Sequence, residues 1–266
     1  MEIKKRKTVG LVLGSGGGRG LAHVGVIKTL LKNNIPIDYI SGSSIGAVVG
    51  AYFALNLEIE GLETIFKSLF KKPFWLINFN LKTGSFINNK RIYDVLKYNL
   101  YSEKTFADTK IPLRINATDI DTGNGYVFKE GKIIDAVVPS MTVPGILPPF
   151  EINGVHLIDG GISNAIPADL LNEFKPDVMI MVDLYNTKIK PLDNYGLKSV
   201  FDRVYKIYIS KLSEFSKKSF NGNYIILNPD TNEKFENLTF QNITRNIKIG
   251  EEETESKIEE IKRLCL

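Results

Sequence analysis

The order of strands and helices expected in the first sixty residues constrains this fold more than any other feature. Val9–Leu13 is a short apolar run ending at a glycine, and Pro36–Ile40 is a second short segment, so both are predicted to be strands. Apolar residues recur at helical spacing over Leu21–Leu31 and Ile45–Leu57, one stretch after each strand. This strand–helix–strand–helix order predicts an α/β fold in which helices cover a parallel sheet.

The remaining sequence continues with both kinds of element. The segment 58–100 is rich in aromatic residues and predicts helices over one end of the sheet, either as a lid or as ordinary core packing. Three prolines and a glycine in VPGILPPF, residues 143–150, predict an irregular segment. Further strands are predicted at Leu113–Thr118, Gly125–Phe128, His156–Ile158, Asp177–Asp183 and Tyr224–Leu227, and further helices at Arg91–Leu100, Ile133–Met141, Leu197–Phe215 and Glu251–Leu264.

A glycine cluster, Gly14–Gly20, joins the first predicted strand to the first helix. Glycines let backbone N–H groups converge where a Cβ would obstruct them. The helix that follows adds the positive end of its dipole, so the loop is a candidate anion site. The anion could be a phosphate, a dinucleotide or a reaction oxyanion. A tight strand-to-helix turn explains the same glycines without any ligand.

A Gly-x-Ser-x-Gly motif, Gly42–Gly46, joins the second predicted strand to the second helix. In that setting the motif is typical of a nucleophile elbow, a sharp turn that presents the serine hydroxyl at the tip of a sheet. The motif therefore predicts Ser44 as a nucleophile. The N–H of Ile45 is expected to point at the same space.

A general base for Ser44 is harder to find, because the chain has only two histidines. His23 lies upstream on the first helix and is predicted to be a buried, hydrogen-bonded residue. His156 and Asp159 are three residues apart on a strand, so their side chains tend to point to opposite faces. Neither histidine is therefore well placed for a Ser–His–Asp triad. Asp159, which ends a predicted strand and is followed by Gly160 and Gly161, is the better candidate.

Four segments together resemble the patatin-like phospholipases, particularly their compact bacterial members. The segments are LGSGGGRGLAHVGVIKTL, PIDYISGSSIGAVVGAYFAL, RINATDIDTG and PSMTVPGILPPFEINGVHLIDGGISNAIP, which cover roughly residues 8–185 in the family's order. The resemblance implies a three-layer α/β/α fold with a central, mainly parallel sheet. We expect a single domain, 1–266, with its motif-bearing core at about 8–185 and a helical C-terminal extension at about 190–266.

The resemblance also implies a chemistry. The family hydrolyses fatty-acyl esters of phospholipids, lysophospholipids or acylglycerols through a Ser–Asp dyad, here Ser44 and Asp159, without a metal or cofactor. The implied oxyanion hole comes from the glycine loop, with Arg19 shaping it, and from the elbow. Its expected members are Gly16, Gly17, Gly18, Arg19 and Ile45. One departure is Ser15, which stands where the family's loop has its first glycine.

Other classes of protein fit less well. A dinucleotide-binding domain would use the first glycine loop, but Ser15 breaks the Gly-x-Gly-x-x-Gly pattern, and Asp38 starts the second strand instead of ending it. A P-loop is excluded because no Gly-Lys-Ser/Thr sequence occurs. A catalytically weak lipid-binding or regulatory protein on the same fold is the remaining alternative, since fold does not fix function. Retention of Ser44 and Asp159 argues against it.

Composition predicts the setting of the protein. A single cysteine, Cys265, excludes an intramolecular disulfide and favours a reducing compartment. The apolar run Thr8–Leu13 is shorter than the roughly 7–15 residues of a signal-peptide core, and no run approaches the ~20 residues of a membrane span. We expect a cytoplasmic protein, at most peripheral at the inner membrane face. The net charge of +4 fits an ordinary solvated surface, and no nucleic-acid partner is expected.

Overall fold

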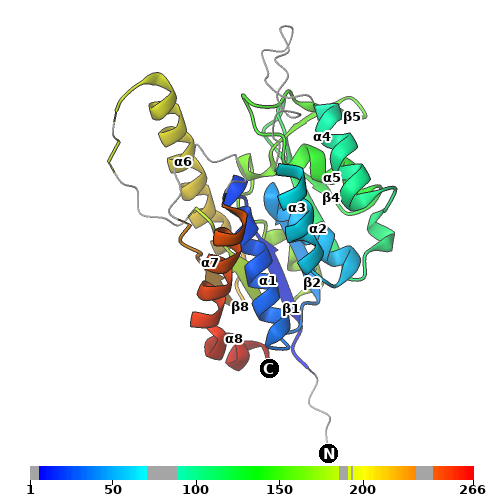
Figure 1. Cartoon of the computed structure of the whole chain (residues 1–266), viewed down its shortest axis with the longest axis vertical. Coiled ribbons are helices and arrows are strands. Elements are labelled where there is room, and N and C mark those ends of the chain that lie inside the picture. Colours follow the sequence, from blue (N-terminus) through cyan, green and yellow to red (C-terminus); the bar gives the residue numbers. More distant parts are fainter. Residues whose placement is uncertain (1–5, 71–88, 186–190, 193, 232–241) are drawn as a thin grey trace, which may run out of the picture.

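A computed structural model of the chain describes residues 6–70, 89–185, 191–192, 194–231 and 242–266. Figure 1 shows a central sheet with helices around it. The described strands are β1 (Val9–Leu13), β2 (Tyr39–Ser43), β3 (Leu113–Asp119), β4 (Gly125–Phe128), β5 (Phe150–Ile152), β6 (Val155–Ile158), β7 (Val178–Val182) and β8 (Asn223–Leu227). The described α-helices are α1 (Ala22–Lys32), α2 (Ile45–Asn56), α3 (Glu60–Phe70), α4 (Asn89–Leu96), α5 (Ile133–Ser140), α6 (Leu197–Ser216), α7 (Ile243–Ser256) and α8 (Ile258–Cys265).

The sheet is mainly parallel, as predicted. Its order is β5-β6-β3-β2-β1-β7-β8, and β4 also pairs with β3. Strands β3, β2, β1, β7 and β8 run parallel to one another. Strands β4, β5 and β6 form an antiparallel margin. The three-layer α/β/α fold is therefore confirmed, with this margin as its one departure from a parallel sheet.

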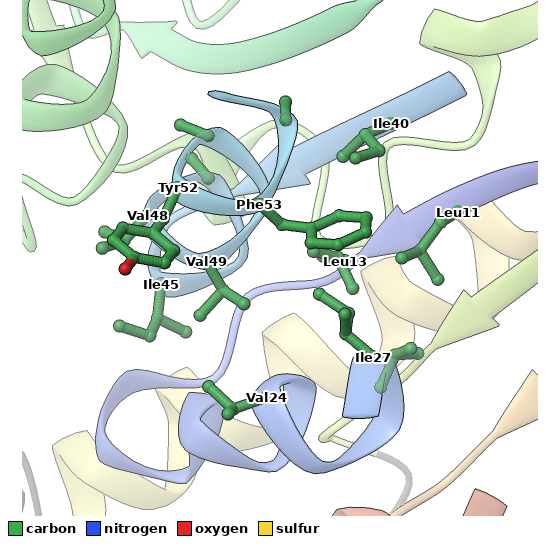
Figure 2. Packing of buried hydrophobic residues seen from close by; sticks show 14 of the residues in the cluster. Leu11, Leu13, Val24, Ile27, Ile40, Ile45, Val48, Val49, Tyr52 and Phe53 are labelled. Carbon is green, nitrogen blue, oxygen red and sulfur yellow. The ribbon is translucent and has the colours of Figure 1, made fainter. Parts of the chain in front are cut away.

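Both faces of the sheet are covered, which is why β1 and β7 are buried along their whole length. Leu11 and Leu13 of β1 belong to a large core cluster that also includes α1, α2, α5 and α7. Val12, between them, faces the other way and packs with Leu171 of a 3-10 helix, Asp169–Phe174. Figure 2 shows the larger cluster, where α1 and α2 pack on β1 and β2.

The second strand was predicted too early. The prediction was Pro36–Ile40, whereas β2 runs from Tyr39 to Ser43. Gly42 and Ser43 suggest a loop by composition, but the parallel ladder between β1 and β3 holds both residues in the sheet. The turn at Ser44 therefore starts directly at the last residue of the strand.

The segment 143–150 is irregular except at its end. Phe150 starts β5, which pairs with β6 in a hairpin that the sequence analysis did not predict. The turn residues Asn153 and Gly154 have φ angles of 52° and 80°. Positive φ at both positions fits a type I′ turn, for which Asn-Gly is the preferred sequence. The dipeptide was a usable signal, and the proline-rich segment before it obscured the strand.

The C-terminal helix was predicted at Glu251–Leu264, which is wrong in two respects. Helix α7 already begins at Ile243, and a break at Lys257 separates it from α8. Polar residues dominate the start of α7, so its helical spacing is weak in the sequence. Ile247 and Ile261 are nevertheless buried in the large core cluster.

Part of the aromatic segment 58–100 is described. Helix α3 lies at its start, and α4 followed by a π-helical turn, Lys97–Tyr101, lies at its end. The buried Phe66 and Tyr101 belong to the large core cluster. The described part therefore contributes to the core. The lid hypothesis concerns residues 71–88, which lie outside the described residues.

Candidate active site

The glycine loop and the serine elbow lie at the same edge of the sheet. The loop follows β1, the elbow follows β2, and the two strands are parallel neighbours with Leu13 opposite Gly42. Parallel strands bring their carboxyl ends together, and ligand crevices of open α/β sheets lie there. The glycine loop and the serine elbow therefore lie at one edge of the sheet.

Ser44 has a strained backbone. Its φ and ψ are 56° and −124°, a region that residues other than glycine seldom adopt. Its N–H donates to the hydroxyl of Ser140, at the end of α5, with 2.9 Å between N and Oγ. A Cβ on Gly46 would collide with the backbone carbonyl oxygen of Leu13. Gly46, the second glycine of the motif, is therefore required for the elbow to lie against the end of β1.

Asp159 lies beside Ser44, although 115 residues separate them in the sequence. The antiparallel strand β6 carries the chain back along β3, and Asp159 follows its last residue. The hydroxyl of Ser44 donates to Oδ2 of Asp159 with an O–O distance of 2.6 Å. The N–H of Gly161 donates to Oδ1 at 2.7 Å. Both oxygens of the carboxyl group are thereby oriented.

The carboxyl group of Asp159 has an altered acidity. Its side chain is buried, and burial raises its pKa from 3.8 to about 6. The hydrogen bonds from Ser44 and Gly161 act in the opposite direction, because they favour the charged form. Desolvation is the larger effect, so this aspartate is a stronger base than an exposed one.

Neither histidine bonds to Ser44 or Asp159, and both lie in the described part of the chain. The buried His23 contacts the carbonyl oxygen of Gly14 through Nε2 at 2.8 Å. Burial lowers its pKa to about 4, so the imidazole is neutral at pH 7. His156 is exposed and contacts Asp121 through Nδ1 at 3.0 Å. The predicted burial of His23 is confirmed, and the geometry provides no Ser–His–Asp triad.

The glycine loop forms a 3-10 helix, Gly17–Leu21, that leads into α1. Gly17 has a φ of 57°, which glycine adopts readily. The first N–H groups of a helix have no acceptor within that helix. Those of Gly17 and Gly18 are therefore available to an anion at the helix start, as in other helix N-termini.

Two side chains fix this loop. Arg19 is buried, donates from Nε to the carbonyl oxygen of Gly16 at 3.2 Å, and places its guanidinium 4.3 Å from the centre of the Tyr185 ring. Ser15, the departure from the family pattern, is also buried and donates to the hydroxyl of Ser43 at 2.9 Å. That bond ties the glycine loop to the end of β2, so serine is accommodated here.

Comparison with known proteins gives the family. The model of the patatin-like phospholipase family matches residues 11–172, which is more than half of the chain. The chain belongs to this family. Within the described residues of this patatin-like protein, no helix has the length and apolar character that a membrane span requires. No group of three or more His, Cys, Asp or Glu in the same residues could hold a metal ion.

Relatives of this patatin-like chain include much longer proteins. The "Lysophospholipase NTE1" of Candida albicans is 31% identical over 203 residues, which is 73% of this chain and 14% of that protein. An uncharacterized NTE family protein of Mycobacterium tuberculosis is 32% identical over 184 residues, or 69% of this chain and 51% of that one. The chain thus spans about half or less of the length of these relatives. The crystal structure of VipD from Legionella pneumophila aligns with a TM-score of 0.49 and 13% identity, over 96% of this chain and 67% of that one.

Sequence reasoning missed three residues that position the pair. The hydroxyl of Ser140 accepts from the N–H of Ser44. Thr118 donates to the carbonyl oxygen of Asp159 at 2.8 Å, and Asn116 donates to that of Gly160 at 2.7 Å. Asn116 and Thr118 lie in RINATDIDTG, and Ser140 is the second residue of PSMTVPG, so the family segments marked their neighbourhood without assigning a role.

Proposed function

We propose that this protein is a serine lipolytic acyl hydrolase that uses Ser44 as nucleophile and Asp159 as base. The single observation that supports this most strongly is the 2.6 Å hydrogen bond from the Ser44 hydroxyl to the buried Asp159 carboxyl group. Family membership supports the lipid class of substrate. The substrates proposed are fatty-acyl esters of phospholipids, lysophospholipids or acylglycerols, and no metal or cofactor takes part.

The proposed reaction has two steps. Asp159 accepts the proton of the Ser44 hydroxyl while Oγ bonds to the ester carbonyl carbon, which gives a tetrahedral oxyanion. The intermediate collapses, the ester C–O bond breaks, and the leaving alkoxide takes the proton from Asp159. Water then attacks the acyl–Ser44 ester with Asp159 again accepting a proton, and the fatty acid leaves as Ser44 regains its hydrogen.

The oxyanion requires donors, because one carboxylate is a modest base for a serine hydroxyl. We assign these to backbone N–H groups of the loop Gly16–Gly18 and of Ile45, with Arg19 holding the loop. The shared sheet edge, the free N–H groups at the helix start and the Ser15–Ser43 hydrogen bond support this assignment. Donors of this kind are usually the largest single contribution to catalysis.

Covalent labelling tests the nucleophile. A fluorophosphonate probe should label the wild-type protein on Ser44, and Ser44→Ala should abolish the labelling without changing the melting temperature. Asp159→Asn should lower the labelling rate by at least about 10²-fold, the usual scale for loss of a general base. Ser256→Ala, an exposed serine on α7, is the matched control and should label normally. Labelling that persists in Ser44→Ala would exclude the assignment.

Product analysis tests the substrate class. The wild-type protein is incubated with phosphatidylcholine, lysophosphatidylcholine and diacylglycerol, and released fatty acid is quantified by mass spectrometry. Release that depends on Ser44 supports the proposal. A folded protein that neither labels nor releases fatty acid would instead be a lipid-binding protein on the same fold.

A further inference from the structure

Helix α6 exposes a row, or stripe, of large apolar side chains. Its members recur at helical spacing, three, four or seven residues apart, so they lie on one side of the helix. They are large side chains, and their exposed fractions are high: Leu197 90%, Phe201 66%, Val204 59%, Tyr208 48% and Phe215 76%. A contiguous apolar surface of this kind marks an interaction site on a soluble protein.

The side of α6 next to the stripe is attached to the body of the protein through the C-terminal half of the helix. Ile209 is buried with Ala165 and Tyr185, and Tyr205 and Leu212 pack against them. At the C-terminal end, the buried Asp183 accepts hydrogen bonds from Ser213 at 2.7 Å and from Lys217 at 2.8 Å. The helix that carries the stripe is therefore attached through residues 205–217, and its N-terminal half, with Phe201 and Val204, is exposed.

The stripe also lies close to the candidate active site. The hydroxyl of Tyr208 donates to the carbonyl oxygen of Ile162 at 2.7 Å. Ile162 ends the 3-10 turn Gly160–Ile162, which directly follows Asp159. In Figure 1, α6 extends away from the N-terminus, toward the end of the molecule at which β1 leads into the glycine loop.

The charge of this segment is positive. Residues 197–218 contain six basic and two acidic residues, a net charge of +4 that equals the net charge of the whole chain. Lys217 is paired with Asp183 and Lys211 with Glu214, whereas Lys218 is exposed and Arg203 is partly exposed. Basic residues beside an apolar helical face are the pattern that binds anionic lipid surfaces.

We infer that α6 is the element by which this protein docks on an anionic lipid surface. The inference rests on the proposed function, because docking through α6 would bring the edge of the sheet that carries Ser44 to the lipid. Phe201, Val204 and Leu197 would insert among the acyl chains, while the basic residues would lie at the headgroups. Substrate could then pass from the bilayer to the site without crossing water.

The test separates docking from chemistry. Vesicle binding is measured by co-sedimentation in the Ser44→Ala background, so that the lipids stay intact. Vesicles of phosphatidylcholine are compared with vesicles that also contain phosphatidylglycerol. Phe201→Ser combined with Val204→Ser should weaken binding to the anionic vesicles at least about tenfold. Tyr98→Ser, which removes an aromatic side chain that lies away from α6 and is even more exposed than Phe201, is the matched control and should bind normally.

Activity gives the second readout. With Ser44 restored, the double variant should hydrolyse vesicle lipid at least about tenfold more slowly at limiting vesicle concentration, and a water-soluble short-chain ester at the wild-type rate. Unchanged vesicle affinity would overturn the inference, as would an equal loss on the soluble ester. Self-association that disappears in the variant, without vesicle binding by the wild type, would mean that a second copy covers α6. Failure of the wild type on every ester would refute the proposed function but leave the binding test valid.

Discussion

At the scale of single residues, burial determines how strong a base Asp159 is. Folding removes its carboxyl group from water and raises its pKa from 3.8 to about 6, while two hydrogen bonds limit the rise. Only the carboxylate can accept the proton of Ser44. We predict that kcat/KM for a soluble ester rises with pH through a midpoint near 6 and then levels off, because kcat/KM reports the free enzyme. A midpoint near 4 in a pH–rate profile would contradict this environment.

The same shift predicts a cost to stability. Since the folded pKa lies above the unfolded value, the neutral acid stabilises the fold at low pH, and that contribution is lost as pH rises through about 6. The full difference corresponds to about 3 kcal/mol. Asp159→Asn never becomes charged, and its amide retains an oxygen for the N–H of Gly161. The melting temperature of Asp159→Asn minus that of the wild type should therefore increase from pH 4 to pH 8. A difference that does not change with pH would contradict the prediction.

Local patterns were sufficient to predict some of the site residues. Ser44 stands in a motif whose glycines have a steric purpose, and Asp159 ends a strand before two glycines, so each carries its own signal. Ser140 carries none. It meets the N–H of Ser44 only because α5 packs beside α2, with 96 residues of sequence between the two partners. Such a contact depends on the tertiary structure, and no spacing rule could have predicted it.

Helices and strands were predicted well where the periodicity of apolar residues determines them. They were predicted poorly where packing against neighbouring elements determines them. The buried strand β7 and the helix α6 agree with their predicted ranges to within a residue or two. The end of β2 was missed because Gly42 and Ser43 are poor strand formers in isolation. Their place in the ladder comes from the strands on both sides, β1 and β3.

Close packing at the junction between β1, β2 and α2 predicts the effect of a substitution at Gly46. A Cβ on Gly46 would meet backbone oxygens of Leu13 and Gly14, which cannot move without displacing the glycine loop. Gly46→Ala should therefore lower kcat on a soluble ester by about 10²-fold, the cost of misplacing catalytic groups by about 1 Å. Gly50→Ala, one turn later in α2, meets only side chains, those of Ile40, Leu13 and Leu113, and should retain most activity. Equal effects of the two substitutions would show that the elbow does not depend on this contact.

At the scale of the whole molecule, the C-terminal helices pack against the motif-bearing core. Helix α7 crosses α1 where Gly25 and Gly250 let the two backbones approach closely. A Cβ on Gly250 would collide with the carbonyl oxygen of Ala22, and a Cβ on Gly25 with that of Ile247. This contact joins the region after residue 190 to the first helix of the motif-bearing core. The sequence could not reveal it, because a glycine inside a helix gives no indication of its partner.

The close crossing of α7 and α1 predicts the direction in which a substitution at Gly250 changes stability. In a helix with free space, Gly→Ala stabilises by roughly 0.5–1 kcal/mol. At Gly250 the new methyl group would force α7 away from α1, and overpacking of this kind costs typically about 1–3 kcal/mol. Gly250→Ala should therefore lower the melting temperature, by roughly 2–4 °C for each kcal/mol in a chain of about this size. Gly125→Ala is the control, because its Cβ would meet only the Ser163 hydroxyl at an ordinary 3.6 Å. A higher melting temperature for Gly250→Ala in a thermal denaturation series would mean that α7 does not pack on α1, and that the C-terminal helices are not part of the core.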